Sequence, residues 1–424
     1  MSSLKDMYRN VVQDDFPETI DVQFGDTNLS YARRSWNIGG EEKGLRYGEN
    51  PDQPAALYAL TTGQPTVGGI AYRGAGQGLV STLTEENMLQ AGKHPGKTNL
   101  TDVDNGINML QYLTAKPAAV ILKHNNPCGA AWSAISLHDA LTKAFWCDRI
   151  AAFGGAVIVN RGIDKATAEF INSTYFEVVA APAYDADALE ILKQRKNLRI
   201  FLIQGLAKLE TFAGTPFLDI KCLQDGGMIV QKSFINRIRT ADDFIPATAE
   251  HENKTVIARA PSKQEADDLL FAWAVESGVT SNSVIFAKNG ATVAIGTGEQ
   301  DRVGCVDIAI HKAYDKYADA LAFTETGLSL YELKAKARHD DEAQATLEAI
   351  MRKTEEAKGG LAGSVIVSDG FFPFRDAVDV AIAQGVTAIA QPGGSMRDID
   401  AITAANETSP QVAMVFTAQR SFKH

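Results

Sequence analysis

Two continuously apolar runs on either side of a helical segment constrain the fold of this chain most. Residues 118–122 and 156–159 carry only apolar side chains, which is typical of buried strands. Residues 137–146 between them read as a helix. A strand, a helix and a second strand in this order favour a parallel or mixed sheet with covering helices. The expected fold class is therefore α/β.

A similar alternation returns in the second half of the chain. Strands are expected at 284–287, 293–296, 364–368 and 388–390, and helices at 305–317 and 376–384. This similarity predicts two related α/β subdomains. The expected organisation is an N-terminal arm at 1–44, a first subdomain at 45–206, a connector with a hairpin at 207–250, and a second subdomain at 251–424 with a helical insertion at 325–360.

Composition restricts the classes of protein to which the chain can belong. Its 424 residues, 45% hydrophobic and 22% charged, are typical of a globular protein with two or three domains. The 41 basic and 52 acidic residues give a formal net charge of −11, which argues against nucleic-acid binding. The scattered cysteines (Cys128, Cys147, Cys222 and Cys305) have neither zinc nor disulfide spacing, so we expect a reducing compartment and no metal ligand among them.

The sequence further predicts a cytoplasmic protein without membrane contact. The first ten residues lack the apolar core of a signal peptide. No run approaches the about 18 apolar residues that a membrane-spanning helix needs.

Lys123 and His124 are the first candidates for chemistry. They follow the apolar run at 118–122 directly, and Pro127 and Gly129 come shortly after them. This pattern predicts a buried strand that ends in a tight loop, where active sites of α/β proteins are common. The lysine supplies a cation and the histidine a proton carrier near neutral pH. The alternative is a solvated lysine beside a structural histidine.

Four residues of the first half are candidates for ligand binding. Arg46 and Tyr47 offer a guanidinium and a hydroxyl group to a phosphate or carboxylate, unless the arginine only caps a helix. Asn99 lies near the expected start of a helix, where it contacts a ligand amide or caps the helix. Gly154 permits the close approach of a ligand or forms a tight turn.

Three residues of the second half are candidates of the same kind. Asn282 precedes a strand, where it faces a reacting centre or bonds its own turn. Arg302 lies near the end of a glycine-rich segment at 296–304 that lacks the spacing of a nucleotide-binding fingerprint. Arg420 lies in the basic C-terminal segment, where chains usually fray.

The loop at 368–376 is unusual because it carries three phenylalanines. Phe371 and Phe374 are suited to line a site for a flat heteroaromatic ring, with Asp376 accepting hydrogen bonds from the ring. The alternative is a loop that lies under a partner subunit. Ser395 follows the next expected strand.

Seven segments that run in order from Leu45 to His424 carry a family resemblance. They are LRYGENPDQ, the Lys-His-x-x-Pro-x-Gly-Ala loop, DRIAAFGG, TSNSVIFAKNG with GTGEQDRV, SDGFFPFRDAVD, QPGGS and the terminal Arg-x-Phe-Lys-His. Together they resemble the transformylase part of the AICAR transformylase/IMP cyclohydrolase family. The segment at 323–363 departs from the family pattern.

The resemblance implies a reaction and an assembly. The family transfers a formyl group from 10-formyltetrahydrofolate to the 5-amino group of AICAR, which gives FAICAR and tetrahydrofolate in purine biosynthesis. The resemblance also implies two cytidine-deaminase-like α/β/α subdomains with mixed sheets, a homodimer with sites at the interface, and room for a structural potassium ion.

The resemblance assigns roles to the candidates by position. Lys123 and His124 match the catalytic pair, and Asn282 lies by the formyl group. Arg46, Tyr47 and Arg420 match phosphate-binding positions, while Asn99 and Gly154 match contacts to the base and carboxamide. The folate pocket corresponds to Arg302, Val303, Phe371, Phe374, Asp376 and Ser395.

One departure and two alternatives complete the expectations. Only a short arm precedes Leu45, so we expect a chain without the family's cyclohydrolase activity, and a separate protein that closes the ring to IMP. One alternative is the same scaffold with another formyl donor. The other is a non-catalytic nucleotide-binding subunit.

Overall fold

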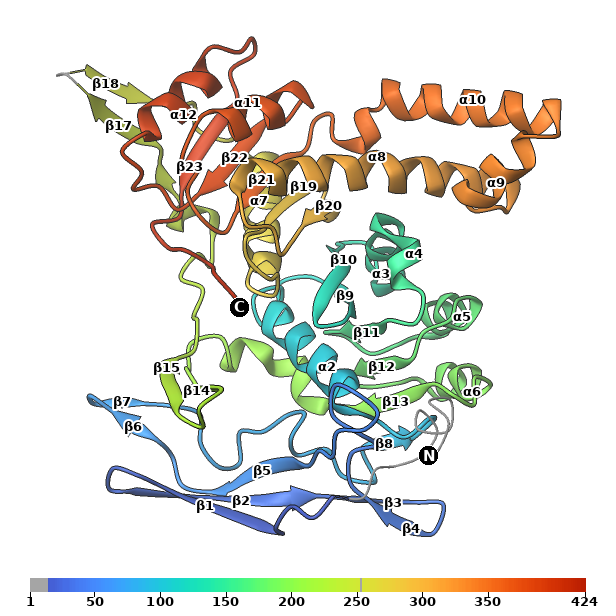
Figure 1. The fold of residues 1–424 in the computed structure, drawn as a ribbon, viewed down its shortest axis with the longest axis vertical. Coiled ribbons are helices and arrows are strands. Elements are labelled where there is room, and N and C mark those ends of the chain that lie inside the picture. Colours follow the sequence, from blue (N-terminus) through green and yellow to red (C-terminus); the bar gives the residue numbers. More distant parts are fainter. Residues whose placement is uncertain (1–13, 252–253) are drawn as a thin grey trace. The chain divides into compact units, whose positions relative to one another are not determined.

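The computed structural model describes residues 14–251 and 254–424, which divide into two units (Figure 1). Unit 1 comprises the chain up to Thr114 together with Leu122–Asn125 and Gly154–Ile235. Unit 2 comprises Ala115–Ile121, Asn126–Phe153 and Asn236–His424. These boundaries differ from the expected subdomains, because Ala115–Ile121 and Asn126–Phe153 of the first half belong to unit 2, and the expected connector belongs to unit 1 as far as Ile235.

Unit 1 begins with strands where an irregular arm was expected. An antiparallel sheet has the order β1 (Thr19–Phe24), β2 (Thr27–Arg34) and β5 (Leu57–Thr62). Three hairpins accompany it: β3 with β4 (Trp36–Ile38, Glu41–Lys43), β6 with β7 (Thr66–Val67, Ile70–Ala71), and β14 with β15 (Leu218–Cys222, Met228–Lys232). The expectation for 1–44 is therefore corrected from residue 19 onward, while residues 1–13 lie outside the described residues. β1 is exposed along most of its length and β2 is mostly half-buried, and polar residues interrupt both, so no apolar run marks them.

The second part of unit 1 contains parallel strands. These are β11 (Ala156–Val159), β12 (Val178–Ala181) and β13 (Arg199–Leu202), with β8 (Met88–Gln90) antiparallel beside β13. Nearly all their side chains are buried, as in a sheet covered on both faces.

Helices of unit 1 precede, connect and follow these strands. They are α2 (Lys97–Leu110), α5 (Lys165–Ser173), α6 (Ala186–Lys193) and the 3₁₀ segment η1 (Gln204–Thr211). Gly106 allows α2 to lie directly on β11, because a Cβ atom at Gly106 would come within 2.8 Å of the Ile158 side chain. This close packing fixes the helix that later supplies several polar side chains.

Unit 2 contains a mixed sheet. Its strands follow the order β16 (Ile245–Pro246), β23 (Ala413–Phe416), β22 (Ala388–Gln391), β21 (Val365–Ser368), β19 (Val284–Lys288), β20 (Ala291–Gly296) and β10 (Asn126–Trp132). Strands β21, β22 and β23 are parallel, whereas β19 and β20 form an antiparallel hairpin. A separate hairpin pairs β17 (Thr248–His251) with β18 (Lys254–Ile257).

Helices cover this sheet and enclose an apolar core. They are α3 (Leu137–Cys147), α4 (Arg149–Ala152), α7 (Lys263–Glu276), α8 (Arg302–Thr326), α11 (Asp376–Ala383) and α12 (Asp398–Asn406), with the short η2 (Ala241–Asp243). The core includes Val284 and Phe286 of β19, Ile366 of β21, and Phe372 of the phenylalanine loop. One of the three loop phenylalanines thus packs in the core.

A helical insertion extends from unit 2, as expected at 325–360. Helix α8 continues to Thr326, well beyond the predicted end at 317, and is followed by α9 (Leu330–Ala337), α10 (Asp341–Glu356) and η3 (Lys358–Gly360) (Figure 1). The three α-helices enclose a small core of their own, which includes Leu333 and Ile350.

Most predicted elements of the α/β regions are confirmed, but one segment differs. Strand β9 (Ala118–Lys123) and β11 lie where the apolar runs indicate, and α3 lies between them in the sequence. However, residues 126–132 form strand β10 where a loop was expected. The loop is instead a two-residue turn, after which the chain pairs back beside β9. Within the described residues, no helix is both long and apolar enough to cross a membrane.

Candidate active site

The predicted catalytic pair of unit 1, Lys123 and His124, lies where strand β9 meets the turn of His124 and Asn125. β9 ends at Lys123, and β10 starts at Asn126. His124 and Asn125 have φ angles of 54° and 62°, and two consecutive positive φ values are characteristic of a type I′ turn. Both side chains are exposed and Lys123 is half-buried. The turn therefore presents the imidazole and leaves the ammonium group partly sheltered.

Gly154 lies beside Lys123. Its backbone has a φ of 78°, and its N–H donates to the Tyr175 carbonyl oxygen at 2.7 Å. A Cβ atom at this position would lie 3.7 Å from the Tyr175 ring and 4.0 Å from Lys123 Nζ. The glycine thus permits the close approach of an ammonium group and an aromatic ring.

Arg46 and Tyr47 lie at the start of helix α2. Arg46 Nη2 donates to the Tyr47 hydroxyl oxygen at 2.8 Å, and the guanidinium carbon lies 4.5 Å from the Tyr47 ring centroid. The N–H of Lys97, the first residue of α2, donates to the Tyr47 carbonyl oxygen at 3.0 Å. A guanidinium beside a helix N-terminus is a favourable environment for an anion.

Asn99 connects the helix to an ion pair whose arginine is buried. Its Oδ1 accepts from the Gly96 N–H at 3.1 Å, so it caps α2, and its Nδ2 lies 3.5 Å from Glu177 Oε2. The same Glu177 oxygen lies 3.3 Å from Nη1 of Arg199, a guanidinium that is 1% exposed. Burial lowers the pKa of Arg199 to about 10, and the charge of Glu177 opposes this shift. Arg199 therefore keeps its charge at neutral pH.

Sequence reasoning missed Tyr175, Glu177 and Arg199. Arg199 could have indicated this group from the sequence, because a charged residue at the start of an apolar strand requires a partner when it is buried. Burial, and next the Glu177 charge, raise the pKa of Tyr175. With these three, unit 1 gathers cations, acceptors and aromatic rings around Asn99 and Gly154, which suits a polar anionic ligand with a ring.

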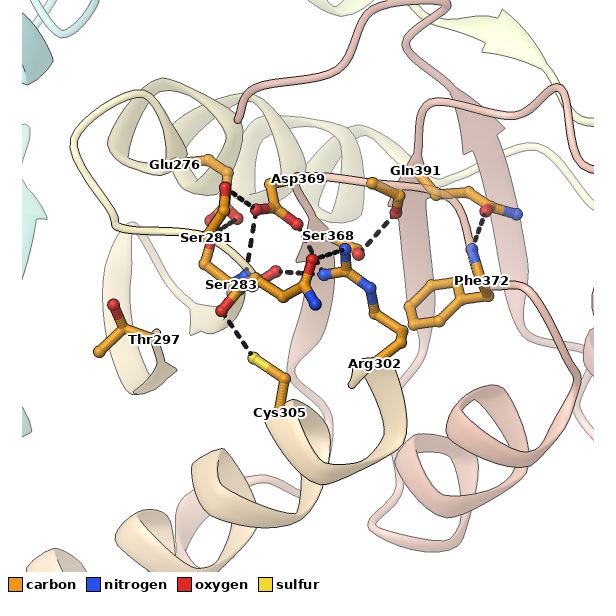
Figure 2. A network of polar contacts seen from close by, with 12 residues as sticks. Glu276, Ser281, Ser283, Thr297, Arg302, Cys305, Ser368, Asp369, Phe372 and Gln391 are labelled. Atoms are coloured by element: carbon orange, nitrogen blue, oxygen red, sulfur yellow. Dashed lines mark hydrogen bonds and ion pairs between the residues drawn. The ribbon is translucent and has the colours of Figure 1, made fainter. Parts of the chain in front are cut away.

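Unit 2 contains a second polar cluster, which centres on Asp369 (Figure 2). The fully buried carboxylate accepts from Arg302 Nη1 at 2.6 Å, from the Ser281 hydroxyl at 2.5 Å and from the Ser283 N–H at 3.1 Å. Arg302 also donates to the Ser283 carbonyl oxygen at 2.9 Å and to Asn282 Oδ1 at 3.1 Å. The network links α8, β21 and the segment before β19.

Burial raises the pKa values of two further acids of this network. Burial, and next the charge of Asp369, raise the pKa of Glu276 well above its usual range, and its Oε1 accepts from the Ser283 hydroxyl at 2.6 Å. Burial raises the pKa of Cys305 to about 12. A thiol with this pKa is a poor nucleophile, so Cys305 has no role as one.

Arg302 and Asn282 are engaged within this cluster. The Arg302 residue is 8% exposed, and its guanidinium is occupied by Asp369, Ser283 and Asn282. The Asn282 amide nitrogen donates to the Gln300 carbonyl oxygen at 3.0 Å. Both side chains therefore stabilise their own surroundings, and their ligand roles stay predictions.

The remaining folate candidates lie on the surface of unit 2. Phe374 is 55% exposed and Phe371 half-buried. Asp376 starts α11 and accepts from the Ala377 N–H at 2.8 Å, and Val303 is half-buried in α8. Ser395 is half-buried, and its hydroxyl oxygen accepts from the Arg397 N–H at 3.1 Å.

The C-terminal segment is anchored, which excludes the frayed tail considered for Arg420. The Ser421 N–H donates to the Asp369 carbonyl oxygen at 3.0 Å, and the Ser281 N–H donates to the Lys423 carbonyl oxygen at 2.9 Å. Arg420 is exposed, with its guanidinium carbon 5.2 Å from the Phe371 ring centroid. Its position is therefore fixed next to the phenylalanine loop.

The candidates thus divide between the units. Unit 1 holds the Lys-His pair and four substrate candidates, whereas Asn282, Arg420 and the folate candidates belong to unit 2. Among the described residues, no group of three or more His, Cys, Asp or Glu side chains is placed to hold a metal ion.

Comparisons with known proteins give one consistent family. A family model described as AICARFT/IMPCHase bienzyme matches residues 7–312. Three similar relatives, each called bifunctional purine biosynthesis protein PurH, come from Roseobacter denitrificans (38% identical, 92% of this chain, 61% of the relative), Parvibaculum lavamentivorans (37%, 91%, 59%) and Caldicellulosiruptor bescii (34%, 90%, 59%). The chain therefore spans about 60% of the length of these relatives.

Proposed function

We propose a formyl-transfer reaction for this chain, which belongs to the AICARFT/IMPCHase bienzyme family. In this reaction 10-formyltetrahydrofolate donates its formyl group to the 5-amino group of AICAR, and the products are FAICAR and tetrahydrofolate. The chain would thereby act in purine biosynthesis, the process named for its relatives.

The observation that carries the proposal is the cluster of unit 1. Lys123 Nζ and the Tyr175 ring both lie near Gly154. Arg46 and Tyr47 lie at the start of the helix that also supplies Asn99. An imidazole follows Lys123 directly. These groups supply what AICAR requires: cations for its phosphate, hydrogen-bond partners for its carboxamide and a proton carrier for its amine.

The proposed reaction exchanges one C–N bond for another. The amine nitrogen of AICAR attacks the formyl carbon, and His124 takes the proton that this nitrogen loses. Lys123 stabilises the tetrahedral oxyanion or supplies the proton that the folate nitrogen needs when its bond to the formyl carbon breaks. The chain's residues thus move one proton from the acceptor to the leaving group.

The folate site and the assembly are part of the proposal. Phe371, Phe374, Asp376, Ser395, Val303 and Arg302 would contact the folate, Asn282 the formyl group and Arg420 the phosphate. The exposed side chains of Phe374 and Arg420 support this, whereas the buried Arg302 supports it least. The cytidine-deaminase-like subdomains, the structural potassium ion and the cytoplasmic location remain predictions.

A homodimer with sites at the interface is likewise proposed. Its support is the hairpin β14–β15, on which Ile220, Met228, Ile229 and Val230 are exposed. A cluster of exposed apolar side chains is typical of an interaction surface.

The test is an assay of the purified chain with AICAR and either 10-formyltetrahydrofolate or formyl phosphate. FAICAR formed with the folate donor supports the proposal, and FAICAR formed only with formyl phosphate supports the other donor. No FAICAR with either donor, together with measurable AICAR binding, would support the non-catalytic subunit. Separating the assay products by chromatography also tests the prediction that no IMP is made.

A further inference from the structure

The backbone of the catalytic turn is held by two side chains of helix α2. The N–H of Asn125 donates to Asp102 Oδ1 at 2.6 Å, and Asn105 Nδ2 donates to the Asn125 carbonyl oxygen at 2.9 Å. Asp102 and Asn105 lie three residues apart, so they share one face of the helix. Both polar groups of the Asn125 backbone are therefore bonded to α2.

These two side chains are buried, although the turn that they hold is exposed. Asp102 is 5% and Asn105 4% exposed, whereas His124 and Asn125 are both exposed. Burying a carboxylate and an amide is unfavourable unless they form hydrogen bonds. A type I′ turn closes without such help when its sequence suits it, as Asn-Gly does. The chain could therefore reverse its direction here without hydrogen bonds from two buried side chains.

The turn residues explain why additional support is needed. His124 and Asn125 enter the left-handed region more readily than most other residues, but less freely than glycine does. Without external hydrogen bonds, the His124–Asn125 backbone would sample other conformations, and the imidazole would move with it. Helix α2 is itself fixed against β11 by the close approach at Gly106.

We propose that Asp102 and Asn105 are positioning residues that hold His124 for proton transfer. This inference rests on the proposed function, because it assigns the turn a catalytic purpose. In this proposal the pair acts through the backbone of Asn125 rather than by contact with either substrate. It therefore affects the rate of the chemical step and leaves AICAR affinity nearly unchanged.

The experiment compares D102A, D102N and N105A with D104A, a substitution of an exposed acid on the same helix. Steady-state kinetics give kcat, titration without donor gives the AICAR dissociation constant, and thermal melting tests the fold. We expect D102A and N105A to lose about 10- to 100-fold in kcat, as displacement of a catalytic group by about 1 Å does. D102N keeps an acceptor and should retain most of the rate.

A second pair of variants changes the turn without altering the buried helix face. Glycine accepts the left-handed conformation at position 125, whereas a β-branched residue does not. We expect kcat of N125V to fall about tenfold or more below that of N125G. Hydrogen–deuterium exchange of residues 123–126 reports the hydrogen bonds from α2 to the turn independently of activity. The exchange should accelerate in D102A but not in D104A.

The outcomes separate this inference from the proposed function. If the wild type makes FAICAR and D102A exchanges faster at the turn yet keeps the kcat of D104A, the positioning role is wrong and the proposed function stands. Equal losses of AICAR affinity, kcat and melting temperature would also overturn it, because they indicate a purely structural role. A wild type that makes no FAICAR overturns both the proposed function and the positioning role of Asp102 and Asn105.

Discussion

At the scale of single residues, the polar interactions of unit 2 converge on Asp369. Its buried carboxylate is paired with Arg302 and is hydrogen-bonded to Ser281 and Ser283. A buried charge destabilises the folded state unless it is paired and fully hydrogen-bonded. The stability of this region therefore depends on each partner.

We expect Asp369→Asn to lower the free energy of unfolding by about 3–5 kcal/mol, because the Arg302 charge is left buried without its partner. Urea denaturation measures the change. The control is D307N, an exposed acid of α8, which should change stability by less than about 0.5 kcal/mol. Similar stabilities of the two variants would contradict the buried-pair account.

Glu276 should make stability depend on pH. Its pKa is raised in the folded chain, so above the usual value of 4.5 the unfolded chain releases this proton while the folded chain keeps it. The folded state therefore loses stability as pH rises from about 4.5 toward the raised pKa. Glu276→Gln keeps an acceptor for Ser283 without a titrating proton. The melting temperature of Glu276→Gln should therefore rise relative to that of the wild type as pH increases above about 4.5, and a pH-independent difference would contradict the assignment.

Arg420 is expected to affect substrate binding rather than the chemical step. Arg420→Ala should raise KM for AICAR about tenfold or more with little change in kcat, because a hydrogen bond to a charged group contributes about 1.5–3 kcal/mol. Initial-rate measurements at varied AICAR decide this. Arg338→Ala, a change of an exposed arginine at the end of α9, is the control. An unchanged KM would place Arg420 outside the site.

At the scale of elements, uniform apolar runs were predictable and mixed segments were not. The run at 156–159 coincides with β11, because four buried side chains leave little ambiguity. Strand β10 was missed because Pro127 and Gly129 usually break strands. The cluster around Asn99 was predicted only in part, since Glu177 and Arg199 reach it from distant strand ends.

The helical insertion should contribute to stability and not to formyl transfer. Ile350 of α10 is fully buried in the small core that α8, α9 and α10 share. Ile350→Ala should cost about 2–5 kcal/mol in the free energy of unfolding of this region, while kcat stays near that of the wild type. Tyr331→Ala, at a side chain that is 82% exposed, is the matched control. A large fall in kcat with little loss of stability would show that the insertion serves the reaction.

At the scale of the whole molecule, the two units hold different parts of the proposed machinery. Unit 1 combines the Lys-His pair with the groups suited to AICAR, and unit 2 combines an anchored C-terminus with exposed aromatic side chains. Local sequence patterns identified residues in both units. They could not show that Arg302 is buried against Asp369, because the two residues are separated by more than sixty positions in the chain.

The central claim is that His124 carries the proton in formyl transfer, and the most direct test is the turnover of His124→Ala together with its AICAR affinity. We expect kcat to fall about 100-fold or more, as loss of a general base implies, while the AICAR dissociation constant stays within about threefold of the wild type. H339A, which removes an exposed histidine of the insertion, should behave as the wild type does. A His124→Ala chain that makes FAICAR at the wild-type rate would contradict the account.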